Sequence, residues 1–376
     1  MRKVLSFFIG IVLVLVTLGV LMMGSASLTK YEGDAAYFWK RQMVWLAVAF
    51  VVAVLAARFD YRRYRRLAIP LALLSIALLI LVRIPGIGHR INGSWRWLRV
   101  GPISIQPSEP AKVAIVVLLS WWLARVRRRI DEPRYGILVP IGILACFVGP
   151  IVVEPDFGTT MLISAVVACM IFLSGANVLP LLAAGLTGLM GLAVLIFRNP
   201  ERMSRIFAFL DPQKYEQGKA WQLINSLRAF ASGGLFGVGF GNSMQKYHYL
   251  PEAHTDFIFP IVGEELGLVA GLAIMLLFLC LFLLGMKIAK EAPDDFGRFL
   301  VYGIILMITL QAVINFAVVT GCVPTKGLAL PFISYGGSSL LVSGVMIGIL
   351  VNVARSAMHA EKDPARGLFK DRTSDV

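Results

Sequence analysis

Apolar residues run along this chain in ten long stretches, separated for the most part by short polar segments. A helix that crosses the hydrocarbon of a membrane needs about 20 predominantly apolar residues, and most of the stretches approach that length. The pattern predicts an all-α polytopic membrane protein with ten transmembrane helices. The predicted spans are residues 4–24, 43–57, 67–83, 108–124, 135–153, 158–174, 178–197, 257–286, 299–320 and 329–354.

The longest polar interruption covers residues 198–256, between the seventh and eighth predicted spans. A loop of this length in a compact bundle is usually functional or disordered. Apolar residues recur near helical spacing over 221–230, which favours a helix lying on the surface. We therefore expect one integral membrane domain over 1–376, with a long external loop at 198–256 and a tail at 355–376.

Composition supports a membrane protein and excludes a soluble enzyme with a single core. Of the 376 residues, 58% are hydrophobic and 15% are charged, with a mean hydropathy of +0.77. Soluble domains average about 45–50% apolar and about 25% charged residues. The four cysteines form no CxxC pair, so neither a disulfide framework nor a zinc site is expected.

The net charge of +14 reports membrane topology. Basic residues cluster after the second and fourth predicted spans, around 58–66 and 125–134, and they recur in the C-terminal tail. Lys and Arg are enriched in cytoplasmic loops, so both termini are expected in the cytoplasm and the 198–256 loop outside. Nucleic acid is not needed as a partner to explain the charge.

Several ionisable residues lie at the predicted outer boundary, where charge at a membrane edge is costly and usually functional. Asp256 stands at the start of the eighth span, with Glu252 and His254 just before it. A helix N-cap at Thr255 or Asp256 is the simpler interpretation, but a cap does not need the two neighbours. Gln245 and Lys246 precede them with a donor group and a positive charge.

Further candidates lie in the other outer segments. Lys326, beside Gly327, is a plausible phosphate contact, and Arg96 is a weaker one. Ser334 and Ser338 open the last span, where helix packing explains small hydroxyl residues equally well. The remaining acidic candidates are Glu109, Glu154 and Asp156, and each has a structural alternative. Glu109 can pair with Lys112, and Glu154 and Asp156 can cap a turn.

Four ordered motifs in this chain resemble those of the SEDS family (shape, elongation, division and sporulation). They are Gln106-Pro107-Ser108-Glu109, Glu154-Pro155-Asp156-Phe157-Gly158-Thr159, Pro251-Glu252-Ala253-His254-Thr255-Asp256-Phe257 and Ile333-Ser334-Tyr335-Gly336-Gly337-Ser338-Ser339. The resemblance covers nearly the whole chain. It implies a ten-span peptidoglycan glycosyltransferase that polymerises lipid II outside the bacterial cytoplasmic (inner) membrane.

The resemblance also implies that Asp256 is catalytic. Lipid II polymerisation forms β1,4-linked glycan strands with inversion and releases undecaprenyl diphosphate, so one carboxylate acting as general base suffices. A divalent cation, Mg or Mn, would assist, with Asp256 as a possible ligand and no organic cofactor. The expected substrate-binding residues are Lys326, Lys246, Gln245, Glu252, His254, Glu109, Glu154, Asp156, Arg96, Ser334 and Ser338.

Within the family, Glu154 and the Thr325-Lys326-Gly327 segment look more like the division branch than the elongation branch. The implied partners are lipid II, the growing glycan strand, a class B penicillin-binding protein that acts as transpeptidase, and divisome regulators. Three alternatives stay open: an elongation polymerase, a flippase that moves lipid II across the bilayer, and a structural division protein without catalysis.

Overall fold

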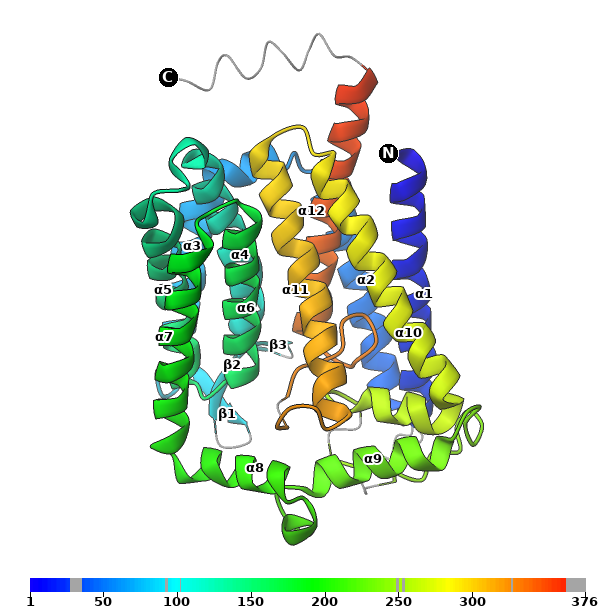
Figure 1. Cartoon of the computed structure of the whole chain (residues 1–376). Helices are drawn as coiled ribbons and strands as arrows, with labels where there is room; N and C mark the ends of the chain where they lie inside the picture. Colours follow the sequence, from blue (N-terminus) through cyan, green and yellow to red (C-terminus); the bar gives the residue numbers. More distant parts are fainter. Residues whose placement is uncertain are drawn as a thin grey trace.

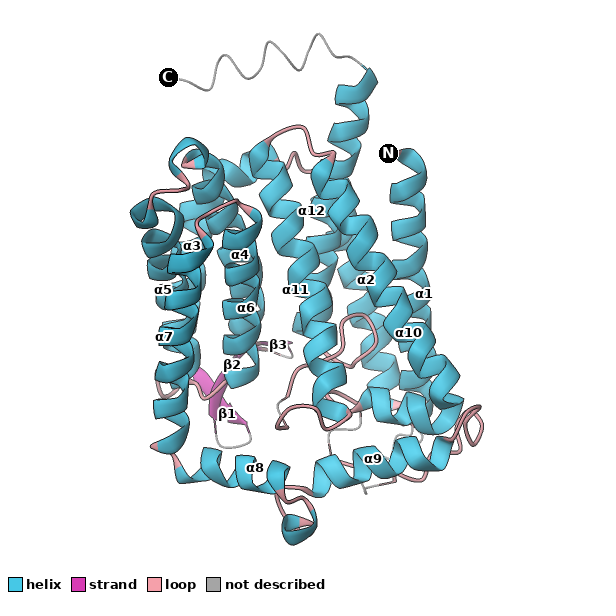
Figure 2. Ribbon diagram, viewed as in Figure 1, coloured by secondary structure: helices cyan, strands magenta, loops and turns pink. Residues whose placement is uncertain are grey.

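A computed structural model gives the arrangement of the chain. It describes residues 1–27, 36–91, 94–101, 103–247, 250–251, 254–325 and 327–362. The architecture is almost entirely helical, with the helices running roughly parallel through one bundle (Figures 1 and 2). The all-α membrane fold expected from the sequence is confirmed.

Each of the ten predicted spans contains a helix. These helices are α1 (Arg2–Ala26), α2 (Tyr37–Arg58), α3 (Arg62–Leu81), α4 (Ser108–Arg125), α5 (Val139–Val153), α6 (Phe157–Leu173), α7 (Val178–Phe197), α10 (Ile258–Lys290), α11 (Asp295–Val319) and α12 (Gly337–Lys362). A one-turn helix, η2 (Arg134–Leu138), precedes α5 directly. Seven segments in the described residues are long and apolar enough to cross a membrane, and α6 and α7 are shorter apolar helices. The count of ten spans stays a prediction.

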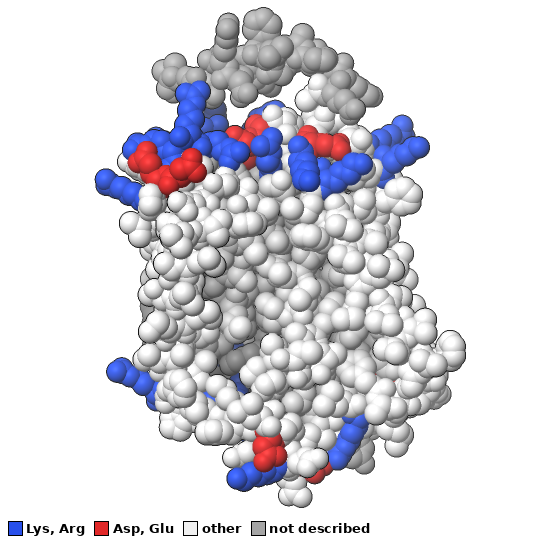
Figure 3. All heavy atoms as spheres, in the orientation of Figure 1, with Lys and Arg blue, Asp and Glu red and all other residues white. Residues whose placement is uncertain are grey.

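The helices surround α11, which is buried over most of its length. It packs against α4, α6, α10 and α12. Met1 and the end of α12 lie at the same face of the bundle, called here the termini face (Figure 1). Lys and Arg form a band at that face and are sparse at the opposite one in the same view (Figure 3).

A small antiparallel sheet lies at the face opposite the termini (Figure 2). Its strands are β1 (Gly88–Ile91), β2 (Ser94–Val100) and β3 (Ile103–Ile105), in the order β1-β2-β3. These strands lie between the predicted spans 67–83 and 108–124, where no secondary structure was predicted. The alternation of tryptophan and arginine over 95–99 was the available signal, because a period of two is typical of a strand.

The last helix begins later than predicted. Residues 320–336 form a loop that turns back into the bundle beside α11 before α12 begins at Gly337 (Figure 1). Side chains of α11 donate hydrogen bonds to backbone carbonyls of this loop. Gln311 Nε2 donates to the Ala329 carbonyl at 2.7 Å, and Asn315 Nδ2 donates to the Leu328 carbonyl at 2.7 Å. Irregular backbone at membrane depth requires such partners.

The first part of the long loop between α7 and α10 is largely helical. It holds α8 (Pro200–Leu210), η3 (Gln213–Tyr215) and α9 (Trp221–Gly233), with α8 and α9 crossing beneath the bundle in Figure 1. The helix expected over 221–230 is confirmed as α9. It packs against α10 and α11, with Leu223 and Ala229 buried, so this half of the loop is docked on the bundle.

Small residues bring α2 and α12 into close contact. A Cβ added to Gly344 would overlap the Ala49 carbonyl of α2, and one added to Gly348 would overlap the Ala53 carbonyl. The two glycines are four residues apart and therefore lie on one face of α12. Small residues at this spacing let the backbones of membrane helices approach closely.

We predict that Gly348→Val forces α2 and α12 apart and destabilises the protein by about 1–3 kcal/mol. Gly185→Ala in α7 is the matched control, because nothing lies within 4 Å of a Cβ at that position. Thermal unfolding of both variants in detergent measures the effect. A Gly348→Val protein as stable as the control variant would contradict the close packing.

Candidate active site at the face opposite the termini

Asp256 lies in the turn that leads into α10. The N-cap residue of α10 is Phe257, so the simple helix-cap interpretation of Asp256 is wrong. The Asp256 carboxylate lies directly against Gly327, where an added Cβ would overlap Oδ2. A glycine at 327 therefore leaves room for this carboxylate.

One buried amide joins the Asp256 turn to the 320–336 loop. Asn315 Nδ2 donates to the Asp256 carbonyl at 2.8 Å and to the Leu328 carbonyl at 2.7 Å. Because Asn315 is itself buried in α11, it fixes both segments relative to the centre of the bundle. The carboxylate of Asp256 is thereby held beside Gly327.

His254 packs among aromatic rings near the same turn. Its ring stacks on Phe38 with centroids 4.1 Å apart and meets Tyr335 edge-on at 5.9 Å. Its carbonyl accepts a hydrogen bond from the Tyr335 amide at 2.9 Å. Burial raises the pKa of the Tyr335 hydroxyl above its usual value. These contacts join the Asp256 turn to the end of the 320–336 loop.

The two candidate serines serve the loop and its neighbours. Ser334 Oγ accepts from the Leu330 amide at 2.7 Å. Ser338 Oγ donates to the Ser104 carbonyl and accepts from the Gln106 amide, both at 3.3 Å. These contacts favour the packing interpretation for both residues.

Asp156 caps α6 and helps to close the same region. Its carboxylate accepts from the Thr159 amide at 3.1 Å and the Thr159 hydroxyl at 2.9 Å. Gln106 Nε2 also donates to it at 3.3 Å. A Cβ on Gly158 would lie 3.1 Å from the Gly327 carbonyl, so the start of α6 packs on the loop beside Asp256.

Glu154 has an unusual environment in the turn between α5 and α6. The residue is only 2% exposed, and neither carboxylate oxygen has a hydrogen-bond partner in the described part of the chain. Its pKa is raised to about 8, first by burial and then by Asp156, against the opposing effect of Arg96 and Arg83. Glu154 is therefore largely protonated at neutral pH.

Arg96 binds the backbone of this turn. Its Nε donates to the Glu154 carbonyl and its Nη2 to the Pro155 carbonyl, both at 2.8 Å. The arginine of β2 thus fastens the sheet to the α5–α6 turn. Arg96 therefore holds this turn, and its contact with substrate stays a prediction.

Glu109 is neutralised inside the bundle. Lys112 Nζ lies 2.7 Å from Glu109 Oε1 and also donates to Gln311 Oε1 at 2.9 Å. The pairing of Glu109 with Lys112 that the sequence suggested is present. Through Gln311 and Ala329 it supports the 320–336 loop.

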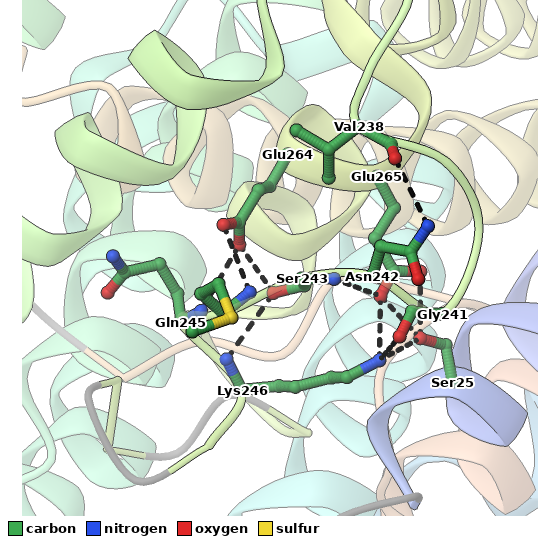
Figure 4. A network of polar contacts seen from close by, with 10 residues as sticks. Ser25, Val238, Gly241, Asn242, Ser243, Gln245, Lys246, Glu264 and Glu265 are labelled. Carbon is green, nitrogen blue, oxygen red and sulfur yellow. Dashed lines mark hydrogen bonds and ion pairs between the residues drawn. The ribbon is translucent and has the colours of Figure 1, made fainter.

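Lys246 is buried, contrary to a role as an open phosphate contact. It is 4% exposed, and its ammonium group donates to Glu265 at 3.0 Å, Ser25 at 3.0 Å and the Gly241 carbonyl at 2.6 Å (Figure 4). An ammonium has three donors, so all are used. This placement does not favour a contact between Lys246 and the diphosphate, and that role stays a prediction.

The neighbouring Glu264 and Glu265 bind the loop that carries Gln245 (Figure 4). Glu264 accepts from the Met244 and Gln245 amides at 3.1 and 3.3 Å, and Glu265 accepts from the Ser25 hydroxyl at 2.6 Å. Gln245 Oε1 is buried without a partner among the described residues. This network joins α1, the external loop and α10.

The helix α10 is broken within two residues of this network. Gly267 has a φ of 80° and a ψ of −178°. Backbone of the external loop replaces the lost helical bonds: the Val238 amide donates to the Glu264 carbonyl at 2.9 Å, and the Leu268 amide to the Gly234 carbonyl at 3.0 Å. The first part of α10, which follows Asp256, is thus an independently held segment.

Two predicted site residues, Lys326 and Glu252, lie outside the described residues. Across the residues that are described, no group of three or more His, Cys, Asp or Glu side chains could hold a metal ion. These residues do not form a ligand set for the expected Mg or Mn ion.

Four residues that hold the site together were not predicted from the sequence: Ser25, Gln311, Asn315 and Gly327. Gln311 and Asn315 could have been found, because a polar amide within an apolar helix needs a hydrogen-bond partner in lipid. Ser25 and Gly327 could not, because their contacts are with distant segments of the chain.

Known proteins match this chain over nearly its full length. The family model described as cell cycle protein, covering FtsW, RodA and SpoVE, matches residues 5–359. The chain belongs to the FtsW/RodA/SpoVE family.

Members of the FtsW/RodA/SpoVE family share substantial identity with the chain. A protein of Trichlorobacter lovleyi named "probable peptidoglycan glycosyltransferase FtsW" is 42% identical over 346 residues, 91% of each chain. Stage V sporulation protein E of Bacillus subtilis is 41% identical over 348 residues, 92% of this chain and 95% of that protein.

Solved structures show the same fold. One is a chain of a peptidoglycan synthase complex that coordinates polymerization and crosslinking, with a TM-score of 0.76 and 27% identity, covering 93% of this chain and 97% of that one. Another is the rod shape determining protein RodA of Thermus thermophilus, with a TM-score of 0.70 and 28% identity, covering 93% and 96%.

We predict that Lys246→Met destabilises this FtsW/RodA/SpoVE family member by about 3–5 kcal/mol, because it leaves Glu265 buried without its cation. The double variant Lys246→Met/Glu265→Gln should recover part of the loss. Lys219→Met is the control, since Lys219 is exposed in the same external loop. Thermal unfolding measures stability; a stable Lys246→Met protein with a raised KM would instead support substrate binding.

Glu154 should make stability depend on pH. The folded state holds the Glu154 proton up to about pH 8, whereas an unfolded chain loses it near 4.3, so stability falls as pH rises between these values. Glu154→Gln removes this loss and should raise the melting temperature at pH 8 by at least about 2 °C, with little change at pH 5.

Glu132→Gln is the control for the pH experiment. Glu132 is exposed, and its hydrogen bond with Arg129 lowers its pKa, so this variant should gain no stability at pH 8. Unfolding monitored from pH 5 to 8 compares the two. Parallel curves for Glu154→Gln and the unchanged protein would show that Glu154 is ionised in the folded state.

Proposed function

We propose that Asp256 is the general base of a peptidoglycan glycosyltransferase that polymerises lipid II during cell division. The enzyme class follows from relatives of about 40% identity that are named peptidoglycan glycosyltransferases. One observation carries the assignment of the base: the Asp256 carboxylate lies against Gly327 in a turn that Asn315 holds rigidly. A rigidly held carboxylate at an outer face suits proton transfer from a bound sugar hydroxyl.

The chemistry needs one carboxylate with this placement. The acceptor hydroxyl loses its proton to Asp256 as its oxygen attacks the anomeric carbon of the donor sugar. The bond from that carbon to the diphosphate breaks, and undecaprenyl diphosphate leaves with the electron pair. Attack from the opposite side inverts the anomeric centre, so the α-linked donor gives a β1,4 bond.

Cations near the outer face would stabilise the leaving diphosphate. Lys326 is the first candidate, because it directly precedes the glycine that touches Asp256. The burial of Lys246 and its pairing with Glu265 make it a weaker candidate than Lys326. His254 lies close to Asp256, where the substrate would contact it. Glu154 and Asp156 lie near the start of α6, which packs on the loop that contains Gly327.

The termini face is proposed to be cytoplasmic and the Asp256 face external. The band of Lys and Arg at the termini face supports this orientation (Figure 3). In a bacterial inner membrane, it puts Asp256 on the side where lipid II is polymerised. A reporter fused after Lys362 would then be active only in the cytoplasm.

Division is proposed over elongation because relatives named FtsW are 39–42% identical to this chain, whereas the RodA structures are 27–28% identical. The similar chain in a complex of polymerization and crosslinking supports a transpeptidase partner. We take this partner to be a class B penicillin-binding protein, with divisome regulators acting on the pair.

We predict that Asp256→Asn folds normally but polymerises lipid II on the order of 100-fold more slowly or worse, because asparagine cannot accept the proton. Gel analysis of glycan product from purified protein, with and without the transpeptidase, measures the rate. Asp211→Asn, in the exposed end of α8, is the control and should keep full activity.

Near-normal polymerisation by Asp256→Asn would sink the base assignment. Translocation of fluorescent lipid II without any glycan product from the unchanged protein would instead support a flippase. Adding excess Mg²⁺ or Mn²⁺ separates a lost base from a lost cation ligand. Rescue by the cation would reassign Asp256 as a metal ligand.

A further inference from the structure

A pocket opens near the termini face, far along the bundle from Asp256. Its volume is about 260 Å³, slightly below the ~300–1,000 Å³ typical of small-molecule sites. It lies where the turn after α4 and the ends of α6 and α10 meet the first turns of α11. The lining residues are Arg127, Leu173, Lys290, Arg298, Phe299 and Tyr302.

The charged side chains of this lining are all basic. Arg127 donates from Nη1 to the Ser174 carbonyl at the end of α6. Its other N–H groups remain available to a ligand in the pocket. Arg298 pairs with Asp295 at 3.0 Å but stays partly exposed. Lys290 has no hydrogen bond or ion pair with any residue in the described ranges. The pocket therefore has an excess of positive charge.

The N-terminus of α11 lies beside the pocket. Asp294 caps the helix by accepting from the Gly297 amide, and Asp295 follows in the first turn and pairs with Arg298. Arg127 and Lys290 come to the pocket from other elements, so pairing along α11 does not explain why these two cations gather there.

Tyr302 supplies a neutral donor beside the three cations. The residue is 7% exposed and lines the pocket. A tyrosine hydroxyl donates one hydrogen bond. A group bound in the pocket, beside Arg298 one turn away, would accept this hydrogen bond.

We propose that this pocket binds a phosphate-bearing anion, with the Tyr302 hydroxyl and the three cations around the phosphate. The headgroup of an anionic phospholipid fits best, because Leu173 and Phe299 give the pocket an apolar wall at the end of membrane-spanning helices. Basic pockets between helices at this membrane boundary are suited to such headgroups. Free phosphate has the same chemistry and is distinguished below.

The test measures lipid binding to the full-length protein in neutral detergent by native mass spectrometry. The probes are phosphatidylglycerol and phosphatidylcholine with identical acyl chains, and inorganic phosphate as a competitor. Phosphatidylglycerol should bind more tightly, and Lys290→Gln/Arg298→Gln should weaken it on the order of tenfold. Tyr302→Phe should weaken it about threefold or more without any change of charge.

The control double variant is Arg65→Gln/Arg66→Gln, which removes two exposed cations of α3 from the same end of the bundle. It should change phosphatidylglycerol binding by less than about twofold. Displacement of the lipid by millimolar phosphate would support the pocket with soluble phosphate as the source. Equal losses in the two double variants, equal binding of the two lipids, or unchanged binding by Tyr302→Phe would overturn the proposal.

Discussion

The broken helix α10 is the constraint on which the face opposite the termini depends. A membrane helix cannot leave backbone groups unpaired, and Gly267 interrupts the helix two turns after it begins. The glycine-rich loop around 233–239 supplies the missing partners with its own backbone. The buried pair of Lys246 and Glu265 then fastens the same loop to α10. The turn that carries Asp256 is therefore positioned by a segment that precedes it in the chain by about 20 residues.

Hydropathy predicted the helices well because lipid admits few other structures. The hydropathy prediction was wrong at the start of the last span, where apolar residues are covered by protein and not by lipid. Residues 329–336 look like the start of a span, but they form the loop that the side chains of Gln311 and Asn315 hold. Hydropathy cannot distinguish an apolar segment that faces lipid from one that packs against neighbouring helices. Hydropathy did not indicate the short strands β1 to β3 either, because they lie between the apolar stretches.

The candidate site was predictable in its centre and less so in its supports. Asp256 stood out because an acidic residue at a membrane edge needs a reason. The role of Lys246 could not be seen, because its partners Glu265 and Ser25 are 19 and 221 residues away along the chain. The same limit applies to Gly327, whose importance is the absence of a side chain against Asp256. Local pattern identifies the reacting group, and the tertiary fold decides which of its neighbours remain available.

The contact between α2 and α12 has a consequence for biosynthesis. Helix α2 is synthesised well before α12 but packs along it, and the loop that touches Asp256 leads into α12. A nascent chain that has reached α11 still lacks the partner for the Ala49 and Ala53 face of α2. The surroundings of Asp256 are thus completed only after α12 has been made, so a chain interrupted before α12 lacks the formed candidate site.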